Sequence, residues 1–329
     1  MKRMNTTRRL LLATVTGMAL SSTALAAGDQ YPTRPIKIIV GYAPGGTTDI
    51  IARLIAPRLA ERLGQTVVVD NRPGAGGNLG AELAAQAAPD GYTLQMGTAG
   101  NMTVNPSIYP NLKFDPVRDF APVSLVAAVP NMMVVNPSVP AKTVAEFITW
   151  AKARPDQVFF ASSGIGNTPH VTGELFNLKT GLKLIHVPYK GSGPALTELI
   201  GGQSAHVMFD NMPSAIGHVR SGALRALATT GPKRSPAMPD LPTLTESGLE
   251  DFAVQGWFGL FAPAKTPAPI IERLHGAVLA ALEHPDTRKS LDTLGAEVVG
   301  NSPAEFGRLV QTESKRWAEV VKASGIELK

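Results

Sequence analysis

Cysteine is absent from this 329-residue sequence. Without cysteine the chain can form no disulfide bond, use no thiolate nucleophile and hold no metal ion through sulfur. Stability must therefore come from the hydrophobic core, and hydrophobic residues make up 44% of the chain. A chain of this length has room for about two domains, each with a buried core of its own.

An excess of either charge is also missing once the N-terminal segment is set aside. Four basic residues lie within its first nine positions, an apolar stretch follows over residues 10–20, and Ala24-Leu25-Ala26 ends it, which is the pattern of a signal peptide. The apolar stretch is too short to span a bilayer, so we expect residues 1–26 to be removed by cleavage near Ala26. The 31 Lys and Arg residues then fall to 27 against 26 Asp and Glu, and we expect no nucleic-acid partner.

Motifs of several enzyme and cofactor classes are missing as well. Neither a Gly-x-Ser-x-Gly elbow nor a Walker A motif occurs, and Pro169 stands where a dinucleotide fingerprint starting at Gly164 needs Gly or Ala. The six histidines lack the paired spacing of a zinc site. We therefore expect no cofactor, no metal ligand and no catalytic residue. A triad of Ser162 or Ser163 with His170 and Asp210 is the weaker alternative, because His170 falls in the first turn of a predicted helix.

What the sequence has in abundance is a repeated order of strand, glycine-bearing loop and helix. Residues 36–40 are a short β-branched run, residues 41–49 a loop with three glycines, and apolar residues then recur at helical spacing until Gly64. Two further strand-and-loop units follow at 65–78 and 92–101. This alternation predicts an α/β fold with a parallel, doubly wound sheet. Pro57 predicts a kink or an interruption in the first helix.

The same order returns in the second half of the chain. Further strands are predicted at 157–161, 183–187, 205–209 and 225–228. Further helices are predicted at 144–153 with Thr143 as the cap, at 170–180, and from Pro194, placed at the first helical position.

Two crossings between domains are predicted. Apolar runs at 124–129 and 132–135, separated by Pro130, indicate the first crossing, and residues 257–262 indicate the return. Helices at 270–283 and 303–323 are expected to pack back on the first domain. The predicted division is residues 28–125 and 255–329 for domain one, and 126–254 for domain two.

Polar loops at the carboxyl ends of the predicted strands indicate a ligand site. Small ligands of open α/β sheets bind at that edge, and free N–H groups at helix starts suit an anion. Each side chain alone could equally cap a helix or close a turn. Together they predict a cleft between the domains. The neutral hydrogen-bonding side chains are Thr47, Thr48, Thr98, Asn101, Ser162, Ser163, Asn167 and Thr168.

Three other residues near this edge have two interpretations each. Asp210 ends a predicted strand, where it could recognise an amino or hydroxyl group of a ligand or cap the following helix. Trp257 and Phe258 could line the cleft, but packing at the crossing is favoured.

Several longer motifs resemble those of the Bug family, the substrate-binding proteins of tripartite tricarboxylate transporters, also called TctC-like. The resemblance covers essentially the whole chain after the signal. The motifs are Tyr31-Pro32-Thr33-Arg34-Pro35, Pro44-Gly45-Gly46-Thr47-Thr48-Asp49, Asn71-Arg72-Pro73-Gly74-Ala75-Gly76-Gly77-Asn78, Pro89-Asp90-Gly91-Tyr92-Thr93-Leu94, Val187-Pro188-Tyr189-Lys190-Gly191 and Phe209-Asp210-Asn211.

The resemblance implies a two-domain type II periplasmic binding protein fold, each domain a doubly wound mixed sheet flanked by helices, with the ligand cleft between. It implies a non-enzymatic receptor that binds a small organic carboxylate (a di- or tricarboxylate, an aromatic acid or an acidic amino acid) and delivers it to membrane permease subunits. A ligand-presenting subunit of a receptor kinase is the alternative, and a carboxylate-processing enzyme the weaker one.

The family's ligand loops match residues 42–49, 98–101 and 162–170 and the strand end at Asp210. In that family the carboxylate is held by backbone amides and ordered waters with little help from arginine, and Arg72 is here the one arginine near these loops. The match adds to the candidate ligand-binding residues Tyr42, Ala43, Gly46, Asp49, Gly164, His170 and Asp210.

Overall fold

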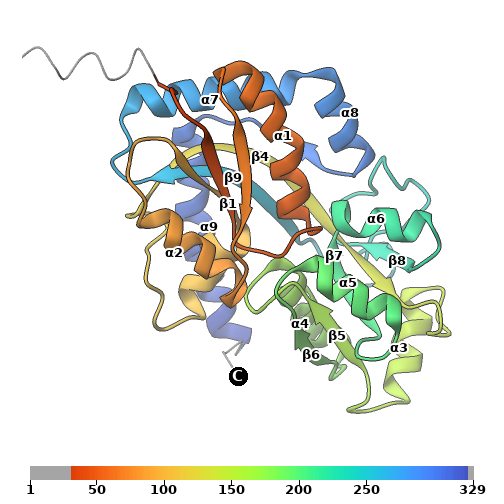
Figure 1. Cartoon of the computed structure of the whole chain (residues 1–329). Coiled ribbons are helices and arrows are strands. Elements are labelled where there is room, and N and C mark those ends of the chain that lie inside the picture. The colour runs from red at the N-terminus through yellow and green to blue at the C-terminus, as the bar shows by residue number, and fades with distance from the viewer. Residues whose placement is uncertain (1–30, 325–329) are drawn as a thin grey trace, which may run out of the picture.

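A mixed β-sheet forms the centre of the molecule in a computed structural model that describes residues 31–324 (Figure 1). The predicted signal peptide lies outside the described residues. Neighbouring strands follow the order β2-β1-β3-β9-β4-β7-β5-β6, with β8 and β10 also paired to β4. The strands are β1 (Ile36–Val40), β2 (Val67–Asn71), β3 (Thr93–Thr98), β4 (Phe120–Val135), β5 (Phe159–Ser162), β6 (Ile185–Pro188), β7 (Val207–Asn211), β8 (Arg225–Thr229), β9 (Gln255–Pro263) and β10 (Glu297–Val298).

The long strand β4 divides this sheet into two halves, because its partners change along its length. From Phe120 to Pro130 it pairs with β9, and from Asn131 to Val135 it pairs with β7 and β8. Figure 1 shows β4, in yellow, running from one half into the other. We call the half with β1, β2, β3, β9 and β10 the first half, and the half with β5, β6, β7 and β8 the second half.

The apolar runs on either side of Pro130 belong to one strand, since β4 continues through both of its prolines. The register slips after Pro122, and Pro130 is the last residue of the ladder with β9. Proline lacks the N–H that a ladder needs, so a strand tolerates it at a bulge or at the end of a pairing.

Helices cover both faces of the first half. Ile38 packs with α1 (Thr47–Leu63) and α7 (Ala268–Glu283) in one hydrophobic cluster, while the next residue, Ile39, packs with α2 (Asn78–Ala85) and α9 (Pro303–Ser324) in another. Successive side chains of a strand point to opposite faces, so β1 is buried on both sides. The short α8 (Pro285–Thr293) follows α7 and, like β10, was not predicted.

The second half has the same two-sided arrangement. Val207 and Phe209 face α3 (Val144–Lys152) and α4 (Thr168–Thr180), whereas Met208 faces α5 (Ser192–Gly201) and α6 (Met212–Arg220). Three short helical turns complete the described elements: η2 (Ala75–Gly77), η3 (Gly100–Val104) and η4 (Asn105–Ser107). No described helix combines the length and apolar character that a membrane crossing needs.

Helix ends agree with the sequence better than helix interiors do. Gly64 and Gly181 end α1 and α4 in the left-handed conformation, and Thr143 caps α3 by accepting the Glu146 N–H. However, α1 runs through Pro57 without the predicted interruption, because buried residues on either side, such as Ile55 and Leu59, hold it against the core.

Pro194 is likewise not the first residue of its helix, because α5 begins at Ser192. Pro194 still lies in the first turn, where a missing N–H breaks no helical hydrogen bond.

Candidate functional site

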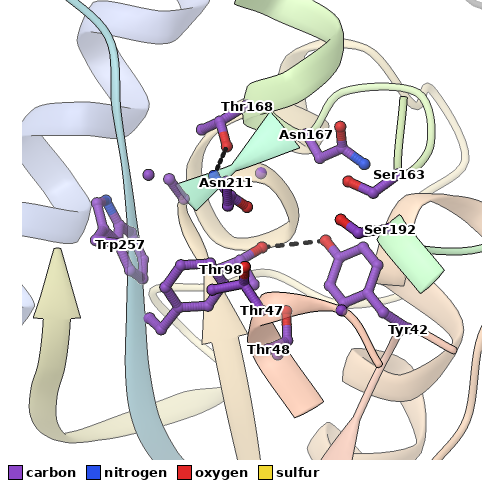
Figure 2. Close-up of a pocket in the computed structure, with 15 residues that line it drawn as sticks. Tyr42, Thr47, Thr48, Thr98, Ser163, Asn167, Thr168, Ser192, Asn211 and Trp257 are labelled. Atoms are coloured by element: carbon purple, nitrogen blue, oxygen red, sulfur yellow. Dashed lines mark hydrogen bonds between the residues drawn. The ribbon is translucent and has the colours of Figure 1, made fainter. Parts of the chain in front are cut away.

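A pocket lies where the two halves meet, at the carboxyl ends of β1, β3, β5 and β7 (Figure 2). Its solvent space is about 20 Å³, little more than the roughly 10–15 Å³ that one water molecule needs. A ligand of several heavy atoms therefore requires the halves to move apart before it enters. The lining residues are Tyr42, Gly46, Thr47, Thr48, Thr98, Ala99, Gly100, Ser163, Asn167, Thr168, Ser192, Asn211, Gly256, Trp257 and Phe258.

Four α-helices begin at this pocket. Gly46, Asn167 and Asn211 are the N-cap residues of α1, α4 and α6, and Ser192 is the first residue of α5. The first-turn N–H groups of a helix have no intrahelical partner, and the helix dipole is positive at this end. Among the described residues that line the pocket, none carries a charged side chain. The helix dipoles and the first-turn N–H groups at this pocket therefore favour an anion.

Two buried N–H groups of lining residues have no partner within residues 31–324. Asn167 Oδ1 accepts the backbone N–H of His170 at 3.3 Å, which caps α4 and leaves Asn167 Nδ2 unpaired. The indole Nε1 of Trp257 is unpaired as well. An unpaired buried donor costs about 1–3 kcal/mol, so an oxygen acceptor in reach of Asn167 Nδ2 would stabilise the site.

Asn101 does not line the pocket itself, but it holds the hydroxyl of the lining residue Thr98 in place. Asn101 Oδ1 accepts the Thr98 backbone N–H at 2.8 Å and the Thr98 Oγ1 hydroxyl at 3.0 Å. Tyr42 lies 3.1 Å from Thr98 Oγ1 and donates its own hydroxyl to the carbonyl of Gly76 at 2.9 Å (Figure 2). Burial raises the pKa of Tyr42 well above its ordinary value, so this hydroxyl stays protonated.

Asp210 likewise forms no part of the pocket lining, and it is completely buried. Its Oδ1 accepts the Ser192 hydroxyl at 2.6 Å and its Oδ2 accepts the Ser214 hydroxyl at 2.5 Å. Burial raises the pKa of Asp210 to about 6, although the two serine hydroxyls stabilise the ionised form. Asp210 neither lines the pocket nor caps α6, so neither of its two predicted roles describes its position.

Direct hydrogen bonds join the two halves beside the pocket. The Ala43 N–H donates to the Lys190 carbonyl at 2.9 Å, and Thr47 Oγ1 lies 2.9 Å from Ser214 Oγ. A Cβ added to Gly46 would lie 3.4 Å from Ser192 Cβ. The halves are therefore closed against each other at the start of α1.

Comparison with known proteins identifies the family. Residues 51–326 match the tripartite tricarboxylate transporter family receptor, TctC. This chain belongs to the TctC family. Protein BugT of Bordetella pertussis (strain Tohama I) is 39% identical over 330 residues, which span 99% of this chain and all of BugT. The predicted Bug or TctC-like receptor is confirmed.

Solved structures of similar proteins confirm the α/β periplasmic binding protein fold. The R. palustris protein Rpa4515 with adipate superposes with a TM-score of 0.88 at 40% identity, covering 90% of this chain and 99% of that one. MatC from Rhodopseudomonas palustris with bound malate has a TM-score of 0.85 at 37% identity, covering 88% of this chain and all of MatC. The TctC proteins are receptors and not enzymes, as expected for this chain.

Eight of the candidate residues of this TctC receptor line the pocket, and seven do not. Those that line it are Tyr42, Gly46, Thr47, Thr48, Thr98, Ser163, Asn167 and Thr168. Those outside the lining are Ala43, Asp49, Asn101, Ser162, Gly164, His170 and Asp210.

Asp49 holds the first glycine loop of the receptor in place. Its carboxylate accepts hydrogen bonds from the Gly45 N–H at 3.1 Å, Arg53 Nε at 2.9 Å and Asn71 Nδ2 at 3.0 Å. Burial acts to raise the pKa of Asp49, but these hydrogen bonds outweigh it and lower the pKa below its ordinary value. Arg72 pairs with Asp70 at 3.0 Å and does not line the pocket.

Ser162 and His170 lie in the second half of the sheet, where both contact His186. The rings of His170 and His186 stack with centroids 4.0 Å apart, and Ser162 Oγ lies 2.7 Å from His186 Nε2. His170 Nδ1 accepts the Gly166 N–H at 3.1 Å. The alternative triad is wrong in geometry, because Ser162 contacts His186 and not His170, while Asp210 bonds to Ser192 and Ser214.

Seven lining residues were not among the candidates: Ala99, Gly100, Ser192, Asn211, Gly256, Trp257 and Phe258. Ala99 and Gly100 lie within the matched family loop 98–101, and Trp257 and Phe258 were considered for the cleft with packing favoured. Sequence reasoning missed Ser192, Asn211 and Gly256. Ser192 could have been found, since its loop follows a predicted strand as the other site loops do. Trp257 was assigned to packing, and it both packs edge-on against Phe306 and lines the pocket.

Proposed function

We propose that this TctC receptor captures a small organic carboxylate in the pocket between the two halves and delivers it to the permease subunits of a tripartite tricarboxylate transporter. The observation that carries the proposal is the convergence of four helix N-termini on a pocket lined without charged side chains. Partial positive charge and unpaired N–H groups favour carboxylate oxygens. The adipate and malate bound to the similar R. palustris proteins agree with this chemistry.

Ligand recognition is assigned to the residues that line the pocket. The eight candidates in the lining act together with Ser192, Asn211 and Trp257. The seven candidates outside it support the loops: Asp49 and Asn101 orient backbone and hydroxyl groups, and Asp210 orients two serines. No metal ion, cofactor or nucleic acid takes part in this function.

Ligand entry and capture use hinge motion of two domains. The hinge is assigned to the places where the chain passes between halves, at Pro130 and Asn131 in β4 and at the start of β9. The proposed domains are residues 28–125 with 255–329, and 126–254. The first of these boundaries falls inside β4, before its change of partner. A ligand that contacts both halves favours the closed arrangement.

Export precedes this function. Cleavage of the signal near Ala26 releases the mature receptor into the periplasm. There the receptor contacts the periplasmic side of the membrane permease.

A thermal-shift screen of the mature protein tests the proposal. Succinate, adipate, malate, citrate, benzoate and glutamate are each compared with an uncharged partner, such as dimethyl adipate for adipate. A ligand that binds only the folded state raises Tm, by the equivalent of about 2.7 kcal/mol at one hundred times its Kd. We expect at least one acid, and no ester, to raise Tm. No shift with any acid, or equal shifts with acid and ester, would overturn carboxylate capture.

A further inference from the structure

On one side of the pocket, formed by Thr47 and Ser192, each hydroxyl proton is already used in a hydrogen bond within the protein. We call this the Ser192 side. At pH values above its pKa, Asp210 is ionised and can only accept hydrogen bonds. Ser192 has one hydroxyl proton, and it donates this proton to Asp210 Oδ1 at 2.6 Å. Ser192 lines the pocket. It therefore presents lone pairs, and no proton, to whatever occupies the pocket.

The same proton count applies to Thr47. Ser214 Oγ lies 2.5 Å from Asp210 Oδ2 and 3.0 Å from the Asn211 carbonyl, and both of these groups are acceptors. The single proton of Ser214 is thus used there, so Thr47 must be the donor in its 2.9 Å contact with Ser214. Thr47 also lines the pocket, so a ligand that reaches its hydroxyl meets only lone pairs there.

On the other side of the pocket, at the start of α4, the residues Ser163, Asn167 and Thr168 have hydrogen-bond donors that are still available. We call this the α4 side. Asn167 Nδ2 has no partner in the described part of the chain, and the Ser163 hydroxyl makes no hydrogen bond within residues 31–324. Thr168 Oγ1 accepts from Asn211 Nδ2 at 3.1 Å, so its own proton is available (Figure 2). This side donates hydrogen bonds, as a carboxylate requires, whereas the Ser192 side accepts them.

We infer that the ligand is a carboxylate that also carries a hydrogen-bond donor, a hydroxyl or an ammonium group, which Thr47 and Ser192 accept. This inference rests on the proposed function, since it specifies which carboxylates the same pocket prefers. An unsubstituted acid of equal length leaves two acceptors of the wall unpaired and presents oxygen lone pairs to them. Sites built to bond a polar group discriminate against the analogue that lacks it.

Calorimetric titration of the mature protein at pH 8 with matched acids tests this inference. Succinate, L-malate and L-aspartate differ only in carrying hydrogen, hydroxyl or ammonium at C2. The corresponding glutarate and adipate series separate chain length from substitution. We expect the hydroxy or amino acid to bind at least tenfold more tightly than the unsubstituted acid at the length that binds best. Within each series, comparison of the hydroxy acid with the amino acid shows whether a hydroxyl or an ammonium group is recognised.

The outcomes distinguish the inference from the proposed function. If the unsubstituted acids bind as tightly as the substituted ones or more tightly, the inference is overturned and carboxylate capture stands. If none of the nine acids binds, both are overturned.

A pair of serine variants tests the role of the wall directly. Ser192→Ala removes an acceptor, so the affinity ratio between substituted and unsubstituted acid should fall to less than about threefold. The control Ser163→Ala removes an uncommitted donor, so it should weaken both acids by similar factors and keep the ratio. Unchanged Tm of the unliganded variants confirms that each is folded. An unchanged ratio in Ser192→Ala would overturn the inference.

Discussion

Thr47 Oγ1 lies 2.9 Å from Ser214 Oγ, and this contact joins the first turn of α1 to the first turn of α6. The two helices pack against different hydrophobic cores, one in each half of the sheet. The contact can form only when the halves are closed. Asp210 holds Ser214 in place through a hydrogen bond. When the halves close, Thr47 therefore meets a Ser214 Oγ whose position is already fixed.

Removing this contact should shift the receptor toward an open form. For Ser214→Ala without ligand, we expect the ratio of closed to open form to fall about two- to tenfold, the factor that one hydrogen bond of roughly 0.5–1.5 kcal/mol represents. Small-angle X-ray scattering would detect a larger radius of gyration. Ser221→Ala is the matched control, because the Ser221 hydroxyl donates to the carbonyl of His218 within the same helix end. Equal radii for Ser214→Ala and the wild type would contradict a role in closure.

A side chain at Gly46 should block closure on the ligand. A Cβ there lies 3.4 Å from Ser192 Cβ and from Ser192 N, and the further methyl groups of Gly46→Val would reach across the cleft. Gly46 has φ −85°, which valine tolerates, so Tm without ligand should stay within about 2 °C of the wild type. Calorimetry should show at least tenfold weaker binding of a cognate acid.

The control for this substitution is Gly276→Val in α7, where an added Cβ meets nothing within 4 Å. Its affinity should equal that of the wild type. Wild-type affinity in Gly46→Val would remove this loop from the site.

Asp210 should make the receptor less stable as pH rises through 6. Its pKa is raised to about 6 in the folded protein from 3.8, so between these values the folded state binds more protons than the unfolded state. Its contribution is favourable at low pH and is lost as pH rises through 6. Relative to Asp210→Asn, the free energy of unfolding of the wild type should increase by up to about 3 kcal/mol from pH 8 to pH 4. Urea denaturation measures both proteins, and parallel pH curves would contradict a raised pKa of Asp210 in the folded protein.

The stacked histidines should have the opposite effect. Burial lowers the pKa of His170 to about 4, and burial together with the neighbouring His170 lowers the pKa of His186 to about 2. The unfolded chain takes up these protons near pH 6.5 and the folded chain does not, so stability falls as pH drops below 6.5. At pH 5 the loss should be about 2 kcal/mol for each histidine.

The variant His186→Gln separates the two histidines, since glutamine can still bond to Ser162. Its loss of stability between pH 7 and pH 5, measured by urea denaturation, should be smaller than that of the wild type by about 2 kcal/mol, the contribution of His186. A loss as large as in the wild type would mean that His186 is protonated in the folded receptor.

The repeated units along the chain were readable from sequence because their signals are local. Ile38 and Ile39 sit in a β-branched run whose neighbours on both faces are apolar, and Gly64, Thr143 and Gly181 mark helix ends through their own backbone or side-chain chemistry. The loops at the carboxyl edge of the sheet were readable for the same reason. The family resemblance rested on these same loops.

Hydrophobic packing between distant segments decided what local signals could not. α1 passes through Pro57, and β4 passes through Pro122 and Pro130, because the gain from burying their neighbours exceeds the cost of a lost backbone hydrogen bond. The residues next to each proline in the sequence show that a backbone hydrogen bond is lost. They do not show the distant residues whose packing offsets that loss.

The sequence by itself therefore determined the α/β alternation, the family and the neutral, anion-seeking character of the loops. Only the tertiary structure decided which of those polar groups face the pocket and which stand behind it. Asp210 and Ser192 are 18 positions apart, and nothing in that spacing says that the carboxylate takes the hydroxyl proton and leaves the hydroxyl oxygen to the ligand. A hydrogen bond has a direction, and that direction is set by which acceptors the fold brings within reach.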